Sequence, residues 1–509
     1  MKESSNGSRT LMDAFISNTL TWVQYWFPGG WGTGFVILHY SLVVIIIARV
    51  MVVRRPVGSS LAWLSMAFLF PLLGFFLYIL FGERNIGRSR RRRAQTLSRI
   101  YRRWILRLIQ SNQLPRQLVA EPFSSISRMA ERVALSPAVG ANQLKLFDHA
   151  SSVFHSLVID IQQARKTCHL EYYLWSTDGE IAKICQALIE ASQRGVQCRL
   201  LLDGVGGKPF LKSPLADQMR QHGIQIEGAL PLNIFRMLYR RMDLRIHRKF
   251  VVIDSEIAYT GSLNMVDPRF FKKNVGVGQW VDAMVRVKGP AALGLDILFH
   301  WDWEIERGER IDDRPLKAQM KYASDESAST VQVIPSGPGY ANQTIQELLI
   351  AVIYAAQKKL VITTPYFVPD EGLLMAIKTA AARGVVVKLI VPHKVDSRMV
   401  RHASHAYYEE LMERGVQIYH YDRGLLHTKS ITVDDKFSVI GTVNLDMRSF
   451  LLNFEVSLFV YDNNFTAQLL ELQQLYMDDS QRISLSRWRQ RSVGYKVMEN
   501  FFHLLAPVL

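Results

Sequence analysis

The sequence predicts an α/β fold of two similar lobes, because the same order of segments occurs twice in its 509 residues. LEYYLWSTDG resembles VITTPYFVPDEG, and each is followed by a helix-period segment that ends in Arg-Gly-Val, at Arg194 and Arg383. The apolar strands CRLLLD and VKLIVP come next, and then a second helix and strand in each half. Alternation of this kind is typical of α/β units, and a repeat of this extent indicates a duplicated architecture. We expect lobes over residues 141–310 and 330–480, joined by a polar linker over 311–329.

The length and the cysteines fit this organisation. A chain this long exceeds what one hydrophobic core usually serves, which predicts two or three domains. The cysteines Cys168, Cys185 and Cys198 lie in or beside predicted strands and helices of the first lobe, without metal-ligand spacing. We therefore expect buried thiols in a reducing compartment.

The N-terminal region differs in composition, because it contains two long apolar runs. Gly32 to Val53 is interrupted only by one histidine and one arginine, and Leu61 to Phe81 carries no charge. Each run can cross about 30 Å of hydrocarbon. Tryptophans near the ends of the runs favour a membrane hairpin over buried core helices. We expect a transmembrane helical hairpin over residues 32–83, after an interfacial segment over 1–31.

A basic juxtamembrane linker is predicted over residues 84–140. Residues 84–103 hold nine arginines and no acidic residue, so they supply nine of the sixteen net positive charges, and +16 − 9 leaves +7. The positive-inside rule then places the lobes in the cytoplasm. A basic tract directly after a membrane span favours an anionic membrane surface over a nucleic acid as its partner.

The most informative repeat is HRKFVVID, which begins at His247, and HTKSITVD, which begins at His427. Each is followed at the same distances by a glycine, a small hydroxyl residue and an asparagine. A single His-x-Lys is usually part of an ordinary solvated strand, but two copies of a five-position pattern indicate a duplicated site. Side chains alternate along a strand, so each histidine shares a face with the lysine two residues on. Asp254 and Asp434 have the opposite parity, which favours a structural role for both.

Paired histidines, lysines, hydroxyls and amides are suited to a phosphodiester. Its transition state gains negative charge, which lysines and polar donors stabilise. One imidazole can attack phosphorus, and the other can protonate the departing alcohol and later deprotonate an incoming one. This chemistry requires no metal and no nucleotide, so we expect no cofactor. DGVGGKPF is only superficially like a phosphate loop, because Pro209 stands where serine or threonine is required.

With the two motifs, the stretches TGSLNMVDPRFF, TTPYFVPD and GTVNLDMRSFLLNFE resemble bacterial cardiolipin synthases, which carry the paired HKD motifs of the phospholipase D superfamily. The resemblance covers nearly the whole chain. It implies two phospholipase D-like lobes with the active site between them, in a multi-pass protein of the bacterial cytoplasmic (inner) membrane. The implied reaction transfers a phosphatidyl group between two phosphatidylglycerol molecules, through a phosphatidyl-histidine intermediate, to give cardiolipin and glycerol.

The resemblance also implies residue roles, with His247 as nucleophile and His427 as general acid and then base. Glu455 and Asp282 match the carboxylates that orient the histidines, and Glu455, which lies 28 residues past His427, is expected to support His427. Val281 departs from the arginine that many relatives carry before the aspartate. The implied site comprises His247, Lys249, Asp254, His427, Lys429 and Asp434 as catalytic residues, Ser262, Asn264, Thr442 and Asn444 for phosphate binding, and Asp282 and Glu455 for histidine orientation.

The sequence leaves two alternative functions and the role of two basic stretches to be considered. Hydrolysis to phosphatidic acid by the same site differs only in whether water or a lipid alcohol meets the intermediate. A non-catalytic binding module is disfavoured, because both motifs are complete. Two basic amphipathic stretches, LNIFRMLYRRMDLRIHRK and the C-terminal segment over residues 481–509, are either membrane contacts or helices packed on their own domain.

Overall fold

The computed structural model describes residues 31–53, 57–83, 87–111, 114–231, 241–272, 275–308, 328–340 and 343–504. Its contacts divide the chain into two compact units. The first comprises Met1–Gly87 and Asn233–Asp243, and the second comprises Arg88–Leu232 and Leu244–Leu509. Residues 1–30 of the predicted interfacial segment, most of the polar linker and residues 232–240 of the first basic amphipathic stretch lie outside the described residues.

The first unit is helical. It contains α2 (Trp31–Val52), α3 (Val57–Leu69), α4 (Pro71–Leu77) and the short π-helix η1 (Tyr78–Gly82). A small core of Ile46, Val50, Ala67 and Tyr78 packs α2, α3 and η1 together. Arg49 Nε donates to Glu83 Oε1 at 2.5 Å, which ties the end of α2 to the end of η1.

The expected transmembrane hairpin is not supported. The second apolar run is not one helix, because α3 ends at Leu69 and Pro71 starts α4. Proline has no amide hydrogen and its ring clashes with the preceding turn, so it divides a helix at this point. At about 1.5 Å per residue, the 13 residues of α3 reach roughly 20 Å, short of about 30 Å of hydrocarbon. Over the stretches that the structure describes, no helix combines the length and apolarity that a membrane crossing requires.

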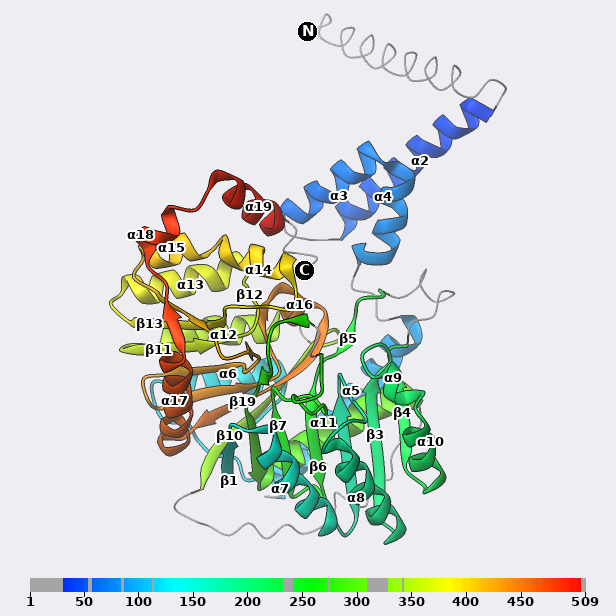
Figure 1. Ribbon diagram of the computed structural model, residues 1–509. Helices are drawn as coiled ribbons and strands as arrows, with labels where there is room; N and C mark the ends of the chain where they lie inside the picture. The colour runs from blue at the N-terminus through cyan, green and yellow to red at the C-terminus, as the bar shows by residue number, and fades with distance from the viewer. Residues whose placement is uncertain are drawn as a thin grey trace, which may run out of the picture. The chain divides into compact units, whose positions relative to one another are not determined.

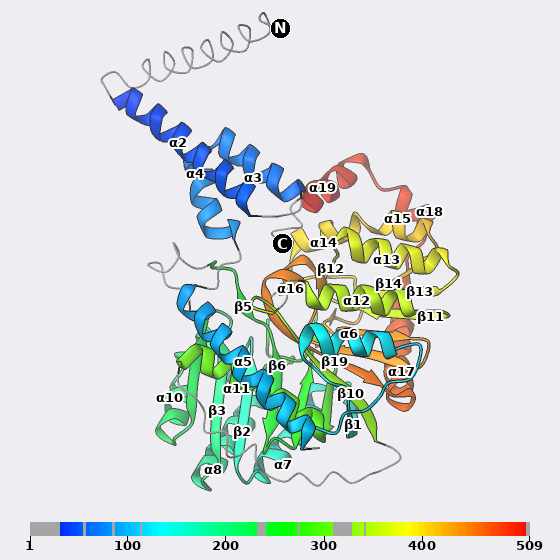
Figure 2. The same ribbon diagram turned by 180° about the vertical axis from the view of Figure 1, so that it is seen from behind.

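The second unit holds both predicted lobes, preceded by the basic helix α5 (Arg88–Gln110) and by α6 (Ser124–Ala134). The first lobe comprises β1 (Val139–Phe147), α7 (Ala150–Gln162), β2 (Thr167–Tyr172), α8 (Ile181–Gln193), β3 (Gln197–Asp203), α9 (Lys208–Leu211), α10 (Pro214–Gln221), β4 (Gln225–Ala229), β5 (Arg245–Ile246), β6 (Lys249–Ile253), β7 (Ile257–Gly261), β8 (Trp280–Val281), β9 (Met284–Lys288) and α11 (Pro290–Arg307). Its strand order is β1-β9-β7-β6-β2-β3-β4. Helices α7 and α8 cover one face of this sheet, and α11 with α5 covers the other (Figures 1 and 2).

The second lobe repeats this architecture. It comprises β10 (Ser329–Ser336), α12 (Thr344–Ala355), β11 (Lys359–Thr363), β12 (Phe367–Val368), α13 (Glu371–Ala382), β13 (Val386–Pro392), α14 (Arg398–His405), α15 (Tyr408–Glu413), β14 (Gln417–Tyr421), β15 (Leu425–Leu426), β16 (Ser430–Val433), β17 (Phe437–Gly441), β18 (Leu445–Asp446), α16 (Met447–Leu451), β19 (Asn453–Tyr461), α17 (Asn463–Asp478), β20 (Ser480–Arg482), α18 (Leu485–Arg489) and α19 (Val493–Leu504). Its strand order is β20-β14-β13-β11-β16-β17-β19-β10.

One continuous sheet joins the lobes. Strand β10 pairs antiparallel with β19 of its own lobe and with β1 of the first. Two short parallel pairs also connect the lobes, because β5 lies beside the start of β19 and β15 lies beside β8. These pairs immediately precede the two motif histidines, so each histidine enters the site alongside a strand of the opposite lobe.

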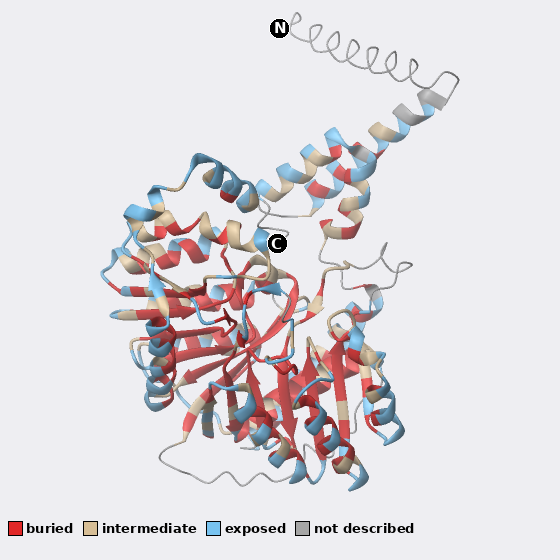
Figure 3. Cartoon of the chain, in the orientation of Figure 1, coloured by how far each residue is buried: buried red, intermediate tan, exposed pale blue. Residues whose placement is uncertain are grey.

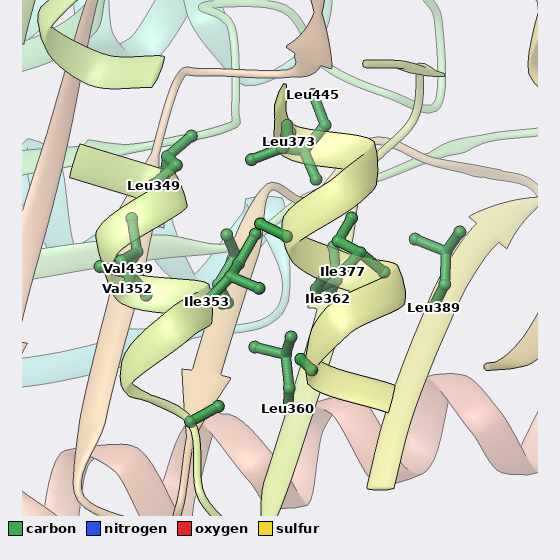
Figure 4. Close-up of a cluster of buried hydrophobic side chains, with 14 of the residues drawn as sticks. Leu349, Val352, Ile353, Leu360, Ile362, Leu373, Ile377, Leu389, Val439 and Leu445 are labelled. Carbon is green, nitrogen blue, oxygen red and sulfur yellow. The ribbon is translucent and has the colours of Figure 1, made fainter. Parts of the chain in front are cut away.

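Each lobe has its own apolar core. In the second lobe, α12 and α13 place Leu349, Ile353 and Ile377 against strand residues such as Ile362 and Leu389 (Figure 4). The predicted buried thiols are confirmed, because Cys168, Cys185 and Cys198 lie in the core of the first lobe as free cysteines. The central strands are buried along almost their whole length (Figure 3), as expected for a sheet covered on both faces.

Candidate active site

Each motif histidine is held by a carboxylate of the other lobe. His247 Nδ1 lies 2.7 Å from Glu455 Oε1, and His427 Nδ1 lies 2.7 Å from Asp282 Oδ1. The expectation that Glu455 supports His427 is therefore wrong. The cause is the pairing of β5 with β19 and of β15 with β8, which places residue 455 beside the first motif and residue 282 beside the second.

These contacts determine which ring nitrogen is free. An ionised carboxylate only accepts hydrogen bonds, so Nδ1 of each ring carries the hydrogen and Nε2 keeps its lone pair. The backbone fixes the rings further, because the His247 amide donates to Phe454 O at 2.9 Å and the His427 amide donates to Val281 O at 2.7 Å. Both imidazoles are thus set up to use Nε2 as nucleophile or base.

Burial keeps both imidazoles neutral near pH 7. It lowers the pKa of His247 to about 4, against the opposing effect of Glu455, and the pKa of His427 also to about 4. Burial alone would raise the pKa of Glu455, but the nearby His247 and Lys249 outweigh it and the pKa of this carboxyl is lowered. The carboxylates therefore stay charged while the rings stay uncharged.

The motif lysines supply positive charge in the same place. Lys249 Nζ donates to His247 O at 2.6 Å, and Lys429 Nζ donates to His427 O at 2.5 Å. Burial lowers the pKa of Lys249 to about 8. Burial and then the charge of Lys249 lower the pKa of Lys429 well below its ordinary value. An anion between the two lysines would favour the charged form of both, which suits the equatorial oxygens of a phosphodiester.

The small hydroxyl residues contact the carboxylates that hold the histidines. Ser262 Oγ donates to Asp282 Oδ1 and Thr442 Oγ1 donates to Glu455 Oε2, each at 2.6 Å. A hydroxyl has one hydrogen to donate, so in this arrangement neither residue can donate to a phosphate oxygen. The structure therefore assigns Ser262 and Thr442 to the support of the carboxylates.

The asparagines of the two repeats lie buried, as phosphate ligands would in an enclosed site. Asn264 Oδ1 accepts from the Leu174 amide at 3.3 Å. Asn444 Oδ1 has no hydrogen-bond partner among the described residues. Phosphate binding by Asn264 and Asn444 remains a prediction.

The repeated glycines are explained by close backbone approach. A Cβ at Gly261 would lie 2.3 Å from Ala283 O, and one at Gly441 would lie 2.3 Å from Val456 O. Only glycine lets β7 and β17 lie this close to the backbone that follows the two carboxylate residues.

The motif aspartates are structural, as their parity predicts, so their inclusion among the catalytic residues of the implied site is wrong. Asp254 accepts hydrogen bonds from the amides of Arg165, Lys166 and Thr167 at 2.7–2.9 Å. Asp434 does the same for residues 357–359. Each aspartate thus fastens the hairpin that follows its motif strand to the start of a neighbouring strand, away from the imidazoles.

Sequence reasoning missed two aromatic residues beside the histidines. The Tyr173 ring lies 5.1 Å from the ring of His247, and the Trp280 ring lies 4.5 Å from the ring of His427. Trp280 could have been found from its parity, because residues 280 and 282 share a face of an extended strand. Tyr173 follows the end of β2 and left no comparable signal.

A second buried histidine group lies outside this site. In the described parts of the chain, His169, Asp296 and His300 are the residues close enough to hold a metal ion. However, His169 Nδ1 donates to Asp296 Oδ1 at 2.6 Å, and Arg199 Nη1 donates to His169 Nε2 at 3.1 Å. Both ring nitrogens are engaged, so the group fits a hydrogen-bonded support between β2 and α11.

The apparent phosphate loop is an ordinary turn. Asp203 Oδ1 accepts from the amides of Val205 and Gly206 at 2.9 and 2.8 Å. A carboxylate already occupies the amides that a phosphate would use. This outcome agrees with the sequence-based interpretation of Asp203 to Phe210.

Comparison with known proteins identifies the relatives. A family profile described as "Cardiolipin synthase, PLD-like domain" matches residues 157–293 and 349–475, and one described as "Phospholipase_D-nuclease N-terminal" matches residues 40–83. Cardiolipin synthase A of Yersinia pseudotuberculosis and that of Yersinia pestis are each 43% identical over 471 residues, which cover 92% of this chain and 97% of theirs. A crystal structure of phosphatidylserine synthase from Haemophilus influenzae has a TM-score of 0.55 at 16% identity, covers 76% of this chain and 100% of its own, and shows the fold alone.

The two α/β lobes share one continuous sheet, and each carries one histidine-lysine motif. This arrangement defines a phospholipase D-like phosphatidyltransferase. Within that class, the chain belongs to the cardiolipin synthase family, because the relatives match over nearly its full length.

Proposed function

We propose that this protein joins two phosphatidylglycerol molecules into cardiolipin and glycerol, with a phosphatidyl-histidine intermediate. The observation that supports this most is the crossed arrangement of the site. Each imidazole is oriented by a carboxylate of the other lobe, at 2.7 Å in both cases. An exchange of one phosphodiester for another needs two such groups, one to hold the phosphatidyl group and one to move the proton.

In the first step His247 Nε2 attacks phosphorus, and the bond from phosphorus to the glycerol oxygen breaks. His427 gives its Nε2 proton to that oxygen, so glycerol leaves neutral. The anionic phosphodiester raises the proton affinity of His427, because an opposite charge within a few Å favours the imidazolium. Lys249 and Lys429 stabilise the charge that develops on the equatorial oxygens.

In the second step His427, now neutral, removes the proton from a hydroxyl of the second phosphatidylglycerol. That oxygen attacks phosphorus, and the bond from phosphorus to His247 breaks. The proton balance closes, because His427 is again an imidazolium and His247 is free. Hydrolysis to phosphatidic acid follows the same path with water in place of the lipid alcohol.

We expect purified protein, given only phosphatidylglycerol in detergent with a metal chelator and no nucleotide, to form cardiolipin and release glycerol in equal amounts. Lipid mass spectrometry and an enzymatic glycerol assay measure the two products. Phosphatidic acid as the main product would reassign the protein to hydrolysis. A strict requirement for a cytidine nucleotide would contradict the proposal.

The first step should have a broad pH optimum with an activated donor such as phosphatidyl-4-nitrophenol, whose leaving group needs no proton. His247 attacks in its neutral form, which is present above its pKa of about 4. Lys249 acts in its charged form, which is present below its pKa of about 8. We therefore expect kcat/KM for nitrophenol release to be level from about pH 5 to 7 and to fall towards pH 4 and above pH 8, since it reports groups of the free enzyme. A midpoint near pH 6.5 on the acidic side would contradict a buried nucleophile.

Two surfaces support membrane association, which we also propose. In the first unit, apolar side chains of α2, α3 and α4 are exposed, including Val44, Met51, Phe68 and Phe76. An apolar surface of this extent is typical of a membrane or protein contact. In the second unit, α19 packs on α14 with one face and exposes Val497, Phe501 and Leu504 on another. The C-terminal segment thus packs on its own domain and also exposes an apolar face, so packing and membrane contact, the two interpretations from the sequence, both find support.

The basic helix α5 adds electrostatic attraction. Its exposed arginines are Arg91, Arg92, Arg93, Arg99, Arg102, Arg103 and Arg107, and its sequence contains no acidic residue. Such a row attracts anionic headgroups by about 1 kcal/mol for each residue near the surface. We propose that the enzyme works at the cytoplasmic face of a bacterial inner membrane, where its substrate lies.

Replacement of Arg99, Arg102 and Arg103 by glutamine should weaken binding to vesicles that contain phosphatidylglycerol. Three lost charges correspond to about 3 kcal/mol, or roughly a hundredfold in the partition coefficient. Cosedimentation at low salt measures the change. The matched control replaces the same residues by lysine, which keeps the charge and should bind as the wild type does. Equal weakening by both sets would indicate that packing of α5, not its charge, is responsible.

A further inference from the structure

The two halves of the site are equivalent residue by residue, which makes their differences informative. Gly261 pairs with Met284 across β7 and β9, and Gly441 pairs with Ser457 across β17 and β19. These registers make Asp282 the counterpart of Glu455. Two residues before these carboxylates, Trp280 is the counterpart of Asn453. The half-sites therefore share histidine, lysine, carboxylate and supporting hydroxyl, but one has an indole where the other has an amide.

Trp280 lies against the ring of His427. The two ring centroids are 4.5 Å apart, with 42° between the planes. Phe271 packs edge-on against the indole at 5.2 Å, and Val277 and Leu425 complete a small apolar cluster around it. The indole is buried, and its Nε1 has no hydrogen-bond partner in the described part of the chain. The ring of His427 thus lies close to the π-system of the indole, and such a π-system attracts a cation.

Asn453 acts on the carboxylate of the other half. Its Nδ2 donates to Glu455 Oε1 at 3.1 Å, the same oxygen that accepts from His247. Glu455 also accepts from Thr442, as Asp282 does from Ser262. Glu455 is thereby shared among three donors, whereas Asp282 Oδ2 has no partner among the described residues. A carboxylate with more donors stabilises a neighbouring imidazolium less.

We propose that Trp280 and Asn453 are positioning residues that make the two histidines unequal. Trp280 favours the imidazolium form of His427, which suits proton transfer to and from the alcohols. Asn453 holds the Glu455 oxygen that accepts from His247, which fixes the direction of the nucleophilic ring. The inference rests on the proposed phosphatidyl-histidine mechanism, and it assigns the two roles from contacts that differ between the lobes.

The test separates proton transfer from nucleophilic attack. A cation and a desolvated indole attract one another by an amount that corresponds to roughly tenfold or more in an equilibrium. Trp280→Leu should therefore slow formation of the phosphatidyl adduct from phosphatidylglycerol about tenfold. With phosphatidyl-4-nitrophenol, the burst of nitrophenol should change less than about twofold, because that leaving group needs no proton from His427. Trp280→Phe keeps an aromatic face and should recover most of the loss.

Asn453→Leu is the matched variant, since it stands at the equivalent position. It should slow adduct formation equally with phosphatidylglycerol and with phosphatidyl-4-nitrophenol, because it acts on the half-site that contains the nucleophile His247. Equal slowing of both donors by Trp280→Leu, or no recovery by Trp280→Phe, would overturn the inference and indicate a packing role. Failure of the proposed mechanism itself would give a different result, because the wild type would then form no phosphatidyl-histidine adduct with either donor.

Discussion

Replacement of His247 by alanine should abolish cardiolipin formation, with a loss of at least about a thousandfold, because it removes the group that holds the phosphatidyl intermediate in the proposed mechanism. The same variant should form no covalent adduct, even from phosphatidyl-4-nitrophenol. His427→Ala should also lose cardiolipin formation, by about 10² to 10⁴, because it removes the general acid and base. With the activated donor, however, His427→Ala should still accumulate lipid on His247.

Mass spectrometry of the acid-quenched protein distinguishes the two variants, because it locates the adduct on a peptide. The control is Asp254→Asn, which keeps the shape of a side chain that lies away from the imidazoles and should keep adduct formation in whatever protein remains folded. A phosphatidyl adduct on the peptide that contains His427 would reverse the two roles.

The crossed carboxylates lead to the second large effect. Glu455 lies in the second lobe but holds His247 of the first, at 2.7 Å. Glu455→Gln should therefore damage the nucleophile, because an amide can donate to Nδ1 and stabilise the tautomer with hydrogen on Nε2. Loss of the orienting carboxylate in a comparable arrangement costs about 10⁴ in rate. We expect a loss of roughly 10² to 10⁴ in adduct formation with either donor.

Asp282→Asn is the matched control, because Asp282 holds His427 in the same way. It should slow the reaction of phosphatidylglycerol by a similar factor but largely spare the nitrophenol burst. Single-turnover kinetics with the two donors measures both. Had the carboxylates supported the histidine of their own repeat, the pattern would be reversed, with Glu455→Gln sparing the burst and Asp282→Asn abolishing it.

The site could be identified from the sequence largely because its parts come in pairs. The spacing from His247 to Asn264 recurs from His427 to Asn444, and strand parity separates Lys249 from Asp254. These are local properties of a strand and its turn, so they depend little on the rest of the chain. Phosphate binding by Ser262 and Thr442 stays a prediction, since sequence shows that a hydroxyl is present but not where its hydrogen points, and in the structure both hydroxyls contact carboxylates.

The N-terminal region shows the limit of composition. Apolar length indicated two membrane-spanning helices, but the second run folds as α3, α4 and η1, with a break at Pro71. Hydropathy sums over a window and does not register a single residue that divides a helix. The proline was visible in the sequence and would have been sufficient to question a single span.

The sequence by itself determined the α/β class, the duplication, the histidines and lysines of the site, and the structural role of the motif aspartates. Each of these follows from periodicity and spacing within a segment or from comparison of the two repeats. Only the tertiary structure decided which carboxylate serves which histidine, and that Trp280 and Asn453 distinguish the two halves. The physical reason is that these contacts depend on the pairing of β5 with β19 and of β15 with β8. Pairing between distant strands is set by the packing of both lobes together, and an internal repeat is equally compatible with contacts within a lobe or between lobes.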